Sequence, residues 1–304
     1  MKHVIKKILG LFLIVVTLSF GAVLRIIYCS VDSWTQRKFY RPEILLKKQH
    51  EYTTLIEQHD AKEISFETED GVHLAALLIE RPQAQRVWII CHGYHQTKES
   101  MRAFATLLPK DSLLLLDLRT HGMSEGDRIS LGAQEYKDIF AAVAFLKNNP
   151  ATSTLPIIGL GVSMGAATLI KAVYKGADIN ALILDCVFAS LDQQMKRAFV
   201  AKSKLPLFMY PCARYIFEWL TKEKVKNLEP VAMIKKITIP VFIIQSQADR
   251  IVLPEDAQAL YQHVPHQQLW ITPANRHCRS FQTFPHEYMQ QVNNFLTNSV
   301  VLLQ

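Results

Sequence analysis

The 304-residue sequence has only five cysteines, and no two of them form a C-x-x-C pair. Without such spacing the chain offers no zinc-binding motif, so we expect no bound metal, and no motif indicates a cofactor. The number of cysteines is odd, and several fall on apolar runs that predict core strands. We interpret all of them as free thiols: Cys29, Cys91, Cys186, Cys212 and Cys278.

A basic stripe interleaved with aromatic residues is also absent, as are internal repeats and low-complexity segments. The formal net charge is +7, but Lys2, Lys6, Lys7 and Arg25 all lie in the N-terminal segment 1–29, which holds no acid, and only +3 remains elsewhere. This distribution excludes nucleic acid as an expected partner. Hydrophobic residues make up 49% of the chain, enough for one large core, and we expect one globular domain.

The N-terminus carries an uncharged apolar run from Ile8 to Leu24. A helix needs about 20 such residues to cross a bilayer, so the run is at the short end of a span, with Arg25 able to snorkel. We expect residues 1–29 to be an uncleaved, single-pass membrane anchor. The alternative is a signal peptide and secretion, because Ser19-Phe20-Gly21 partly fits a cleavage site. Basic residues flank the run on both sides, so its orientation stays open.

Residues 30–61 are interpreted as a linker, and residues 62–304 as the folded domain. Its first signal is Glu69-Asp70-Gly71, an Asp-Gly turn between two strand patterns that predicts a β-hairpin. Apolar runs then alternate with helical patterns, which predicts an α/β fold with a mostly parallel central sheet and helices on both faces. The expected later strands are Val87–Cys91, Ser112–Leu116, Pro156–Leu160, residues 182–187, Ile239–Gln245 and Gln268–Thr272.

The most informative motif is Gly161-Val162-Ser163-Met164-Gly165, a G-x-S-x-G run directly behind an apolar strand. A buried helix is expected after it. The serine of such a strand-to-helix turn adopts strained backbone angles that expose its hydroxyl, and the glycines avoid collisions. Ser163 is therefore the candidate nucleophile. Taken alone, the motif also fits a glycine-rich turn of another doubly wound protein.

A serine nucleophile needs a base and an acid that orients the base. Asp249 follows the run ending at Gln245, at the carboxyl end of a late strand where open α/β sheets keep their sites. We choose it as the acid, although it also fits a turn former. Asp185 ends an earlier strand and is the second choice.

His277 is the candidate base because it follows the last predicted strand and precedes the final helix. The order Ser163, Asp249, His277 is the one used by α/β hydrolases. Three other histidines lie nearby but outside this loop: His263, His266 and His286. Cys278 could be reactive beside His277, but packing is the favoured interpretation.

Acyl transfer also needs donors for the developing oxyanion, each worth roughly 3 kcal/mol of barrier. The backbone amides of Met164 and Tyr94 are the candidates; Tyr94 follows His92-Gly93 at the end of a predicted strand. We expect His92 to brace that loop. In the segment from Asp117 to Gly126 we expect Arg119 and Asp117 to hold each other in place beneath the site.

These motifs together resemble the α/β-hydrolase superfamily over roughly residues 62–298. The resemblance is greatest to membrane-tethered hydrolases related to serine aminopeptidase-like and lysophospholipid or acyl-protein hydrolases. It implies the α/β-hydrolase fold and the triad Ser163, Asp249 and His277, but no substrate. Thr120 and Gln247 depart from the resemblance, since many members have glycine at both positions.

The segment between the predicted strands 182–187 and Ile239–Gln245 is too long for a plain crossover. We expect residues 189–238 to form a small helical cap. Its helices are predicted at Leu191–Lys202 and Pro206–Leu220. The second is rich in aromatic residues, which suit either the wall of a site for an acyl substrate or packing on the core below.

The sequence therefore predicts a serine hydrolase of carboxylic esters or thioesters that acts on a small-molecule or lipid-like acyl substrate. A peptide hydrolase acting on free N-termini is the alternative enzyme. It would need a buried acid to bind the amine, for which the cap offers Glu218, Glu223 and Glu229. A third possibility is a catalytically silent α/β-hydrolase fold that only binds its ligand.

Overall fold

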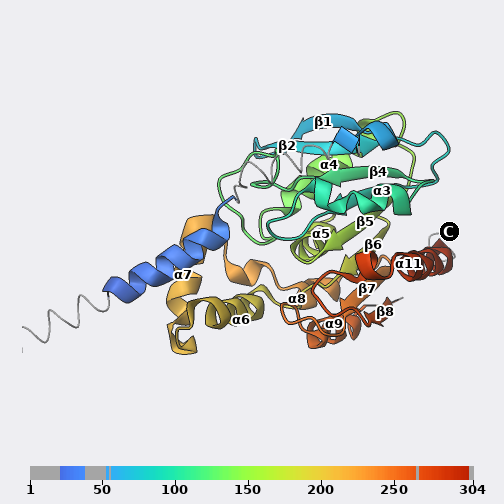
Figure 1. Ribbon diagram of the computed structural model, residues 1–304. Helices are drawn as coiled ribbons and strands as arrows, with labels where there is room; N and C mark the ends of the chain where they lie inside the picture. The colour runs from blue at the N-terminus through green and yellow to red at the C-terminus, as the bar shows by residue number, and fades with distance from the viewer. Residues whose placement is uncertain (1–20, 38–52, 55, 265–266, 301–304) are drawn as a thin grey trace, which may run out of the picture.

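A computed structural model describes residues 21–37, 53–54, 56–264 and 267–300. They form an eight-stranded sheet in the order β1-β2-β4-β3-β5-β6-β7-β8 (Figure 1). The hairpin β1–β2 is antiparallel, β2 pairs antiparallel with β4, and the remaining strands run parallel. The strands are β1 Lys62–Glu67, β2 His73–Ile79, β3 Val87–Cys91, β4 Ser112–Leu116, β5 Ile157–Val162, β6 Ala181–Asp185, β7 Val241–Ser246 and β8 Gln267–Thr272.

Helices cover both faces of the sheet and create two hydrophobic cores. Helices α4, α5, α8 and α9 contribute to the first core, and α3, α10 and α11 to the second. The helices that follow β3 are η1 Lys98–Met101, α3 Ala103–Leu107, α4 Tyr136–Asn148, α5 Met164–Tyr174, α6 Leu191–Ser203, η2 Leu207–Met209, α7 Tyr210–Thr221, η3 Val225–Asn227, α8 Pro230–Ile234, α9 Pro254–Tyr261, α10 Ser280–Thr283 and α11 Pro285–Val300.

Strand β3 shows why the sequence gives continuous apolar runs. Val87 and Ile89 face the first core, Trp88 and Ile90 face the second, and all are buried. A parallel strand covered on both faces has no solvent side, so it does not alternate between apolar and polar residues. The expected α/β fold with a mostly parallel sheet is confirmed.

Residues 21–35 form a helix that crosses the expected boundary between anchor and linker at residue 29. Its Ile27, Val31 and Trp34 are buried in the first core, and this packing explains why it continues beyond the apolar run. No helix within residues 21–37, 53–54, 56–264 and 267–300 is both long and apolar enough to span a bilayer. Residues 1–20, which are most of the expected anchor 1–29, lie outside the described residues.

The segment predicted as a cap, residues 189–238, contains α6, η2, α7, η3 and α8 between β6 and β7; we call it the insertion. Its aromatic residues divide between packing on the core and exposure to solvent. Tyr210 and Phe217 are buried in the first core, whereas Phe208, Tyr215 and Trp219 face solvent. Packing on the core therefore accounts for only part of the aromatic stripe.

Candidate functional site

Ser163 lies at the turn between β5 and α5, directly before the first residue of the helix, with φ +54° and ψ −112°. A non-glycine residue at positive φ is strained, and such strain persists only where the surroundings impose it. The serine amide donates to the Asp185 carbonyl at 2.8 Å, which ties the turn to the neighbouring strand β6.

The two glycines of the motif are required by backbone contacts. A Cβ on Gly161 would lie 2.6 Å from the backbone of Ala166, and one on Gly165 would lie 2.5 Å from the carbonyl oxygen of Cys91. Real Cβ atoms do not approach backbone so closely. The pattern therefore reflects a tight approach of α5 to β3 and β5, as expected for a nucleophile turn.

The structure brings Ser163, His277 and Asp249 together, although they are far apart in sequence. His277 Nε2 lies 2.9 Å from Ser163 Oγ, and its Nδ1 lies 2.6 Å from Asp249 Oδ2. The other carboxylate oxygen of Asp249 accepts the amides of Ile251 at 2.8 Å and Val252 at 3.1 Å. These bonds leave Asp249 Oδ2 directed at the imidazole.

Asp249 and His277 each stabilise the charged form of the other. Burial opposes ionisation of Asp249, but its hydrogen bond to His277 and the nearby imidazolium charge outweigh burial and hold the Asp249 pKa below its usual value. Burial likewise opposes protonation of His277, yet the bond to Asp249 raises the pKa of His277 above 6.5. An imidazolium at position 277 would thus be stabilised by Asp249.

The competing acid and the neighbouring thiol do not occupy this position. Asp185 is fully buried, and burial raises its pKa well above the usual range, which favours the neutral carboxyl. Cys278 packs in the second core, where burial raises its pKa and disfavours the reactive thiolate.

One group of candidate metal ligands exists within the described part of the chain: Cys186, His277 and Cys278, whose ligand atoms lie within 4.8 Å of one another. His277 is already hydrogen-bonded through both ring nitrogens, to Asp249 and to Ser163. Binding a metal would require breaking one of these bonds, so the geometry favours an acid–base role for His277.

The loop after β3 is braced by His92, as its position predicted. His92 Nδ1 donates to the Gly93 carbonyl at 2.8 Å, and its Nε2 accepts the Leu118 amide at 3.1 Å. Burial lowers the pKa of His92 well below 6.5, consistent with this neutral, bridging form. Strand β3 pairs with β5, so the braced loop lies beside the serine turn. Tyr94 belongs to this loop and Met164 begins α5; their oxyanion role stays a prediction.

The expected pairing of Arg119 with Asp117 is wrong. Arg119 instead binds Asp138 on α4 at 2.6 Å and Asp70 of the β1–β2 turn through two bonds of 2.9 Å. Asp117 binds the buried ammonium of Lys98 at 2.6 Å. Arg119 and Asp117 therefore form their ion pairs with residues of other elements and not with each other.

The two departures from the family pattern differ in consequence. Thr120 has φ +64°, the left-handed conformation that glycine adopts most easily, which explains why many members have glycine there. Gln247 is not among the residues with positive φ, and its amide donates to the Thr272 carbonyl at 2.9 Å. A side chain at position 247 is therefore accommodated without strain.

Sequence reasoning missed the part of the N-terminal helix that touches the site. The Tyr94 hydroxyl donates to the Trp34 carbonyl at 2.9 Å, and the ammonium of Lys202 on α6 lies 5.6 Å from the Trp34 ring centre. Lys202 also lies 5.9 Å from the Tyr94 ring centre. Trp34, a large apolar residue within a polar segment, was the available signal. The helix of residues 21–35 and α6 thus meet over the candidate oxyanion loop.

Gln245 was also missed. Its side-chain amide donates to the carbonyl of Val252 at 3.1 Å and approaches Asp249 Oδ2 at 3.4 Å. It fixes the loop that carries the acid. A polar residue at the end of an otherwise apolar strand was the signal for it.

The insertion acids considered for amine binding have other contacts or a pKa raised by burial. Glu218 accepts from Arg214 at 3.2 Å and from Lys224 at 3.1 Å. Glu223 accepts a side-chain amide at 3.4 Å, and burial raises the pKa of Glu229, which disfavours its carboxylate. Two cations already neutralise Glu218, so it offers little charge to a substrate amine.

Comparison with known proteins agrees with the geometry. The family model described as serine aminopeptidase, S33, matches residues 82–231. Protein YqkD of Bacillus subtilis is 31% identical over 219 residues, which cover 69% of this chain and 70% of that protein. Thiohydrolase AneE of Aspergillus aculeatus is 30% identical over 135 residues, which cover 43% of this chain and 42% of that protein.

A solved esterase of Pyrococcus furiosus has a TM-score of 0.67 and 27% identity, and the match covers 80% of this chain and 94% of the esterase. The sheet order, the serine turn and these relatives agree. The chain therefore belongs to the α/β-hydrolase superfamily, and it is a hydrolase of that type.

Proposed function

We propose that this protein is a serine hydrolase that cleaves carboxylic ester or thioester bonds, with Ser163, His277 and Asp249 as catalytic residues. The observation that carries the proposal is the pair of hydrogen bonds through His277, 2.9 Å to Ser163 Oγ and 2.6 Å to Asp249 Oδ2. A base positioned between a strained serine and a buried carboxylate is the arrangement that activates a hydroxyl.

In the first half-reaction, His277 Nε2 removes the proton of Ser163 while Oγ attacks the substrate carbonyl carbon. The carbonyl electrons move to oxygen, and the amides of Met164 and Tyr94 hold the oxyanion, each contributing roughly 3 kcal/mol. His277 then protonates the leaving alcohol or thiol, which departs and leaves an acyl-enzyme. Water, deprotonated by His277, releases the acid and restores Ser163. Asp249 keeps Nδ1 protonated throughout.

Ester or thioester chemistry is favoured over peptide cleavage by the state of the insertion acids. The matching family is described as serine aminopeptidase, but Glu218 is already bound by Arg214 and Lys224. Similar proteins include an esterase and a thiohydrolase. A small-molecule or lipid-like acyl substrate fits these relatives.

The test is turnover of three substrate classes by the full chain: p-nitrophenyl acyl esters, acyl thioesters and aminoacyl amides. We expect the first or second class to be hydrolysed, and Ser163→Ala to abolish turnover while its thermal unfolding matches wild type. Preference for aminoacyl amides would transfer the assignment to the peptidase alternative. A folded wild type that hydrolyses none of the three would support the binding-protein alternative.

We also propose that residues 8–24 anchor the enzyme in a membrane, because this apolar run carries no charge. Secretion after signal cleavage is the alternative. The test is extraction of cell membranes with alkaline carbonate, together with the intact mass of the recovered protein. An anchored protein stays in the pellet at full mass; a soluble protein that has lost its N-terminal segment would contradict the anchor. Reporter fusions would then assign the side of the membrane.

A further inference from the structure

The insertion has a large excess of positive over negative charge. Residues 189–238 hold ten lysines and arginines but four acids, a formal charge of +6 out of +7 for the whole chain. The N-terminal segment 1–29 adds +4, so the rest of the protein is slightly acidic. Positive charge is therefore concentrated in two segments rather than spread over the surface.

The insertion also exposes large apolar side chains. Phe208 is 79% exposed, Tyr215 70%, Trp219 62% and Leu207 52%. Tyr215 and Trp219 are four positions apart on α7 and thus share one face of that helix. A single exposed aromatic residue needs no explanation, but a cluster of them on consecutive elements marks an interaction surface.

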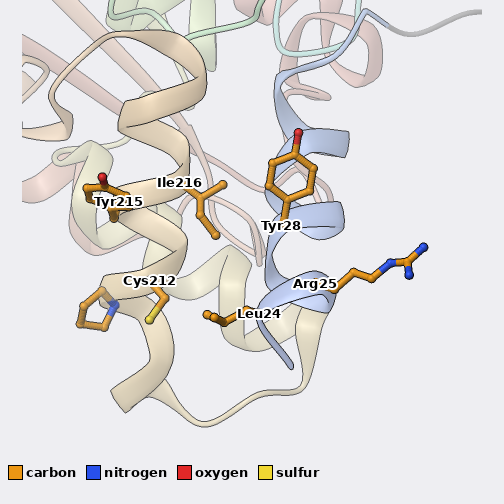
Figure 2. A pocket seen from close by; sticks show the side chains of 7 residues that line it. Leu24, Arg25, Tyr28, Cys212, Tyr215 and Ile216 are labelled. Carbon is orange, nitrogen blue, oxygen red and sulfur yellow. The ribbon is translucent and has the colours of Figure 1, made fainter. Parts of the chain in front are cut away.

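The N-terminal helix lies beside this surface. An open groove of about 650 Å³ separates residues 21–35 from α7, and Leu24, Tyr28 and Ile216 line it (Figure 2). Arg25 also borders the groove, and its side chain extends away from α7. The apolar run of residues 8–24 ends at Leu24, which is itself one of the residues that line this groove.

We propose that this surface, formed by Leu207, Phe208, Tyr215, Trp219 and the groove beside them, rests on an anionic phospholipid bilayer. Trp and Tyr prefer the membrane interface, where an apolar ring is buried and its polar group stays hydrated. Each lysine or arginine near anionic headgroups contributes about 1 kcal/mol, or about fivefold in binding. The insertion carries both features within one stretch of the chain, independently of the anchor.

Charge argues against the other occupants of the surface. A second copy would bring its own insertion of charge +6 against this one, and like charges at an interface oppose association. The segment 1–20 of the same chain carries Lys2, Lys6 and Lys7 and no acid, so it does not complement the surface either. A negatively charged, partly apolar surface does.

This placement brings the site close to the bilayer. Trp34 lies ten positions beyond Leu24 on the same helix, about 15 Å at about 1.5 Å per residue, and its carbonyl accepts the Tyr94 hydroxyl. The helix of residues 21–35 therefore runs from the membrane-facing groove to the candidate oxyanion loop.

The test uses Trp219 as a reporter of contact. The full chain is reconstituted with vesicles of phosphatidylcholine and phosphatidylserine that carry brominated acyl chains, which quench nearby tryptophan fluorescence. We expect quenching in wild type, loss of most of it in Trp219→Phe, and a decrease when phosphatidylserine is omitted. Phe208→Glu should also reduce quenching. Phe140→Glu is the control and should leave quenching unchanged, since Phe140 is a solvent-accessible phenylalanine on α4, outside the proposed surface.

Other outcomes would overturn the proposal. The protein could float with the vesicles in a density gradient while the brominated chains quench wild type and Trp219→Phe equally. That result would mean that only the N-terminal segment binds lipid. Without vesicles, Trp219 fluorescence could be protected from quenching by dissolved acrylamide. Protection that increases with protein concentration would assign the surface to a second copy, and protection that does not would assign it to the segment 1–20. The assay involves no hydrolysis, so its result is independent of the proposed activity.

Discussion

Replacing Asp249 by Asn reverses the hydrogen-bond pattern around His277 while keeping the shape of the site. The Asn carbonyl can take the place of Oδ1 and still accept the amides of Ile251 and Val252. Its amide nitrogen then replaces Oδ2, 2.6 Å from His277 Nδ1. A donor at that position favours the tautomer in which Nδ1 accepts and Nε2 carries the proton, so Nε2 cannot accept the proton of Ser163.

The expected loss follows from this change of tautomer. The same substitution in a Ser-His-Asp enzyme lowers kcat by about 10⁴-fold, or about 5.5 kcal/mol of transition-state stabilisation. Asp249 also raises the pKa of His277, so the variant loses basicity as well as the correct tautomer. We expect kcat/KM to fall by about 10³-fold to 10⁴-fold, with little change in unfolding free energy.

The assay is hydrolysis of the best acyl ester as a function of pH, with unfolding followed by circular dichroism. Asp185→Asn is the matched control: burial already favours its neutral carboxyl, which an amide resembles, so we expect near-normal kcat/KM. Equal losses in both variants, or a large loss in Asp185→Asn alone, would refute the assignment of Asp249 as the orienting acid.

Three further predictions concern the serine turn, the base and the buried ion pairs. Gly165→Ala places a Cβ 2.5 Å from the Cys91 carbonyl oxygen. We expect the variant to lose about 1–3 kcal/mol of stability and most of its activity, and wild-type activity would contradict the turn geometry. Acid protonates His277, whose pKa lies above 6.5, so kcat/KM should fall with decreasing pH at a midpoint above 6.5 and not below it. Arg119→Met leaves the buried carboxylate of Asp138 uncompensated, and denaturant unfolding should show a loss of about 3–5 kcal/mol. The loss should be larger at pH 8 than at pH 5, since burial raises the Asp138 pKa and acid neutralises the group; equal losses would contradict this reasoning.

The central strands could be predicted from sequence because burial on both faces gives them continuous apolar runs. The predictions for β3 and β4 match at both ends, and β5 differs slightly at each end. The convergence of Ser163, Asp249 and His277 at one site could be predicted for a related reason. Parallel strands end at one edge of a sheet, so residues that follow their carboxyl ends come together without further information.

Contacts between distant elements could not be predicted in this way. Arg119 pairs with Asp138 and Asp70, and nothing in the local pattern distinguishes them from the nearer Asp117. The helix of residues 21–35 is a similar case. Its buried Trp34 belongs to the core, but the apolar run before it made the segment resemble the end of a membrane anchor.

The exposed aromatic residues of α7 illustrate a further limit. Phe217 and Trp219 are close together on one helix, yet one is buried in the core and the other faces solvent. Aromatic content alone predicts an apolar surface for that helix, not its partner. The partner depends on which side of the helix packs on the core, and this is fixed by tertiary structure.

The central claim is that Ser163 is an activated nucleophile. The most direct measurement is labelling of the folded, full-length protein with a fluorophosphonate, followed by mass spectrometry of the labelled peptide. We predict one adduct, on Ser163, that disappears in Ser163→Ala and is strongly reduced in His277→Ala. Absence of an adduct on a folded wild type, or an adduct that persists in both variants, would contradict the account.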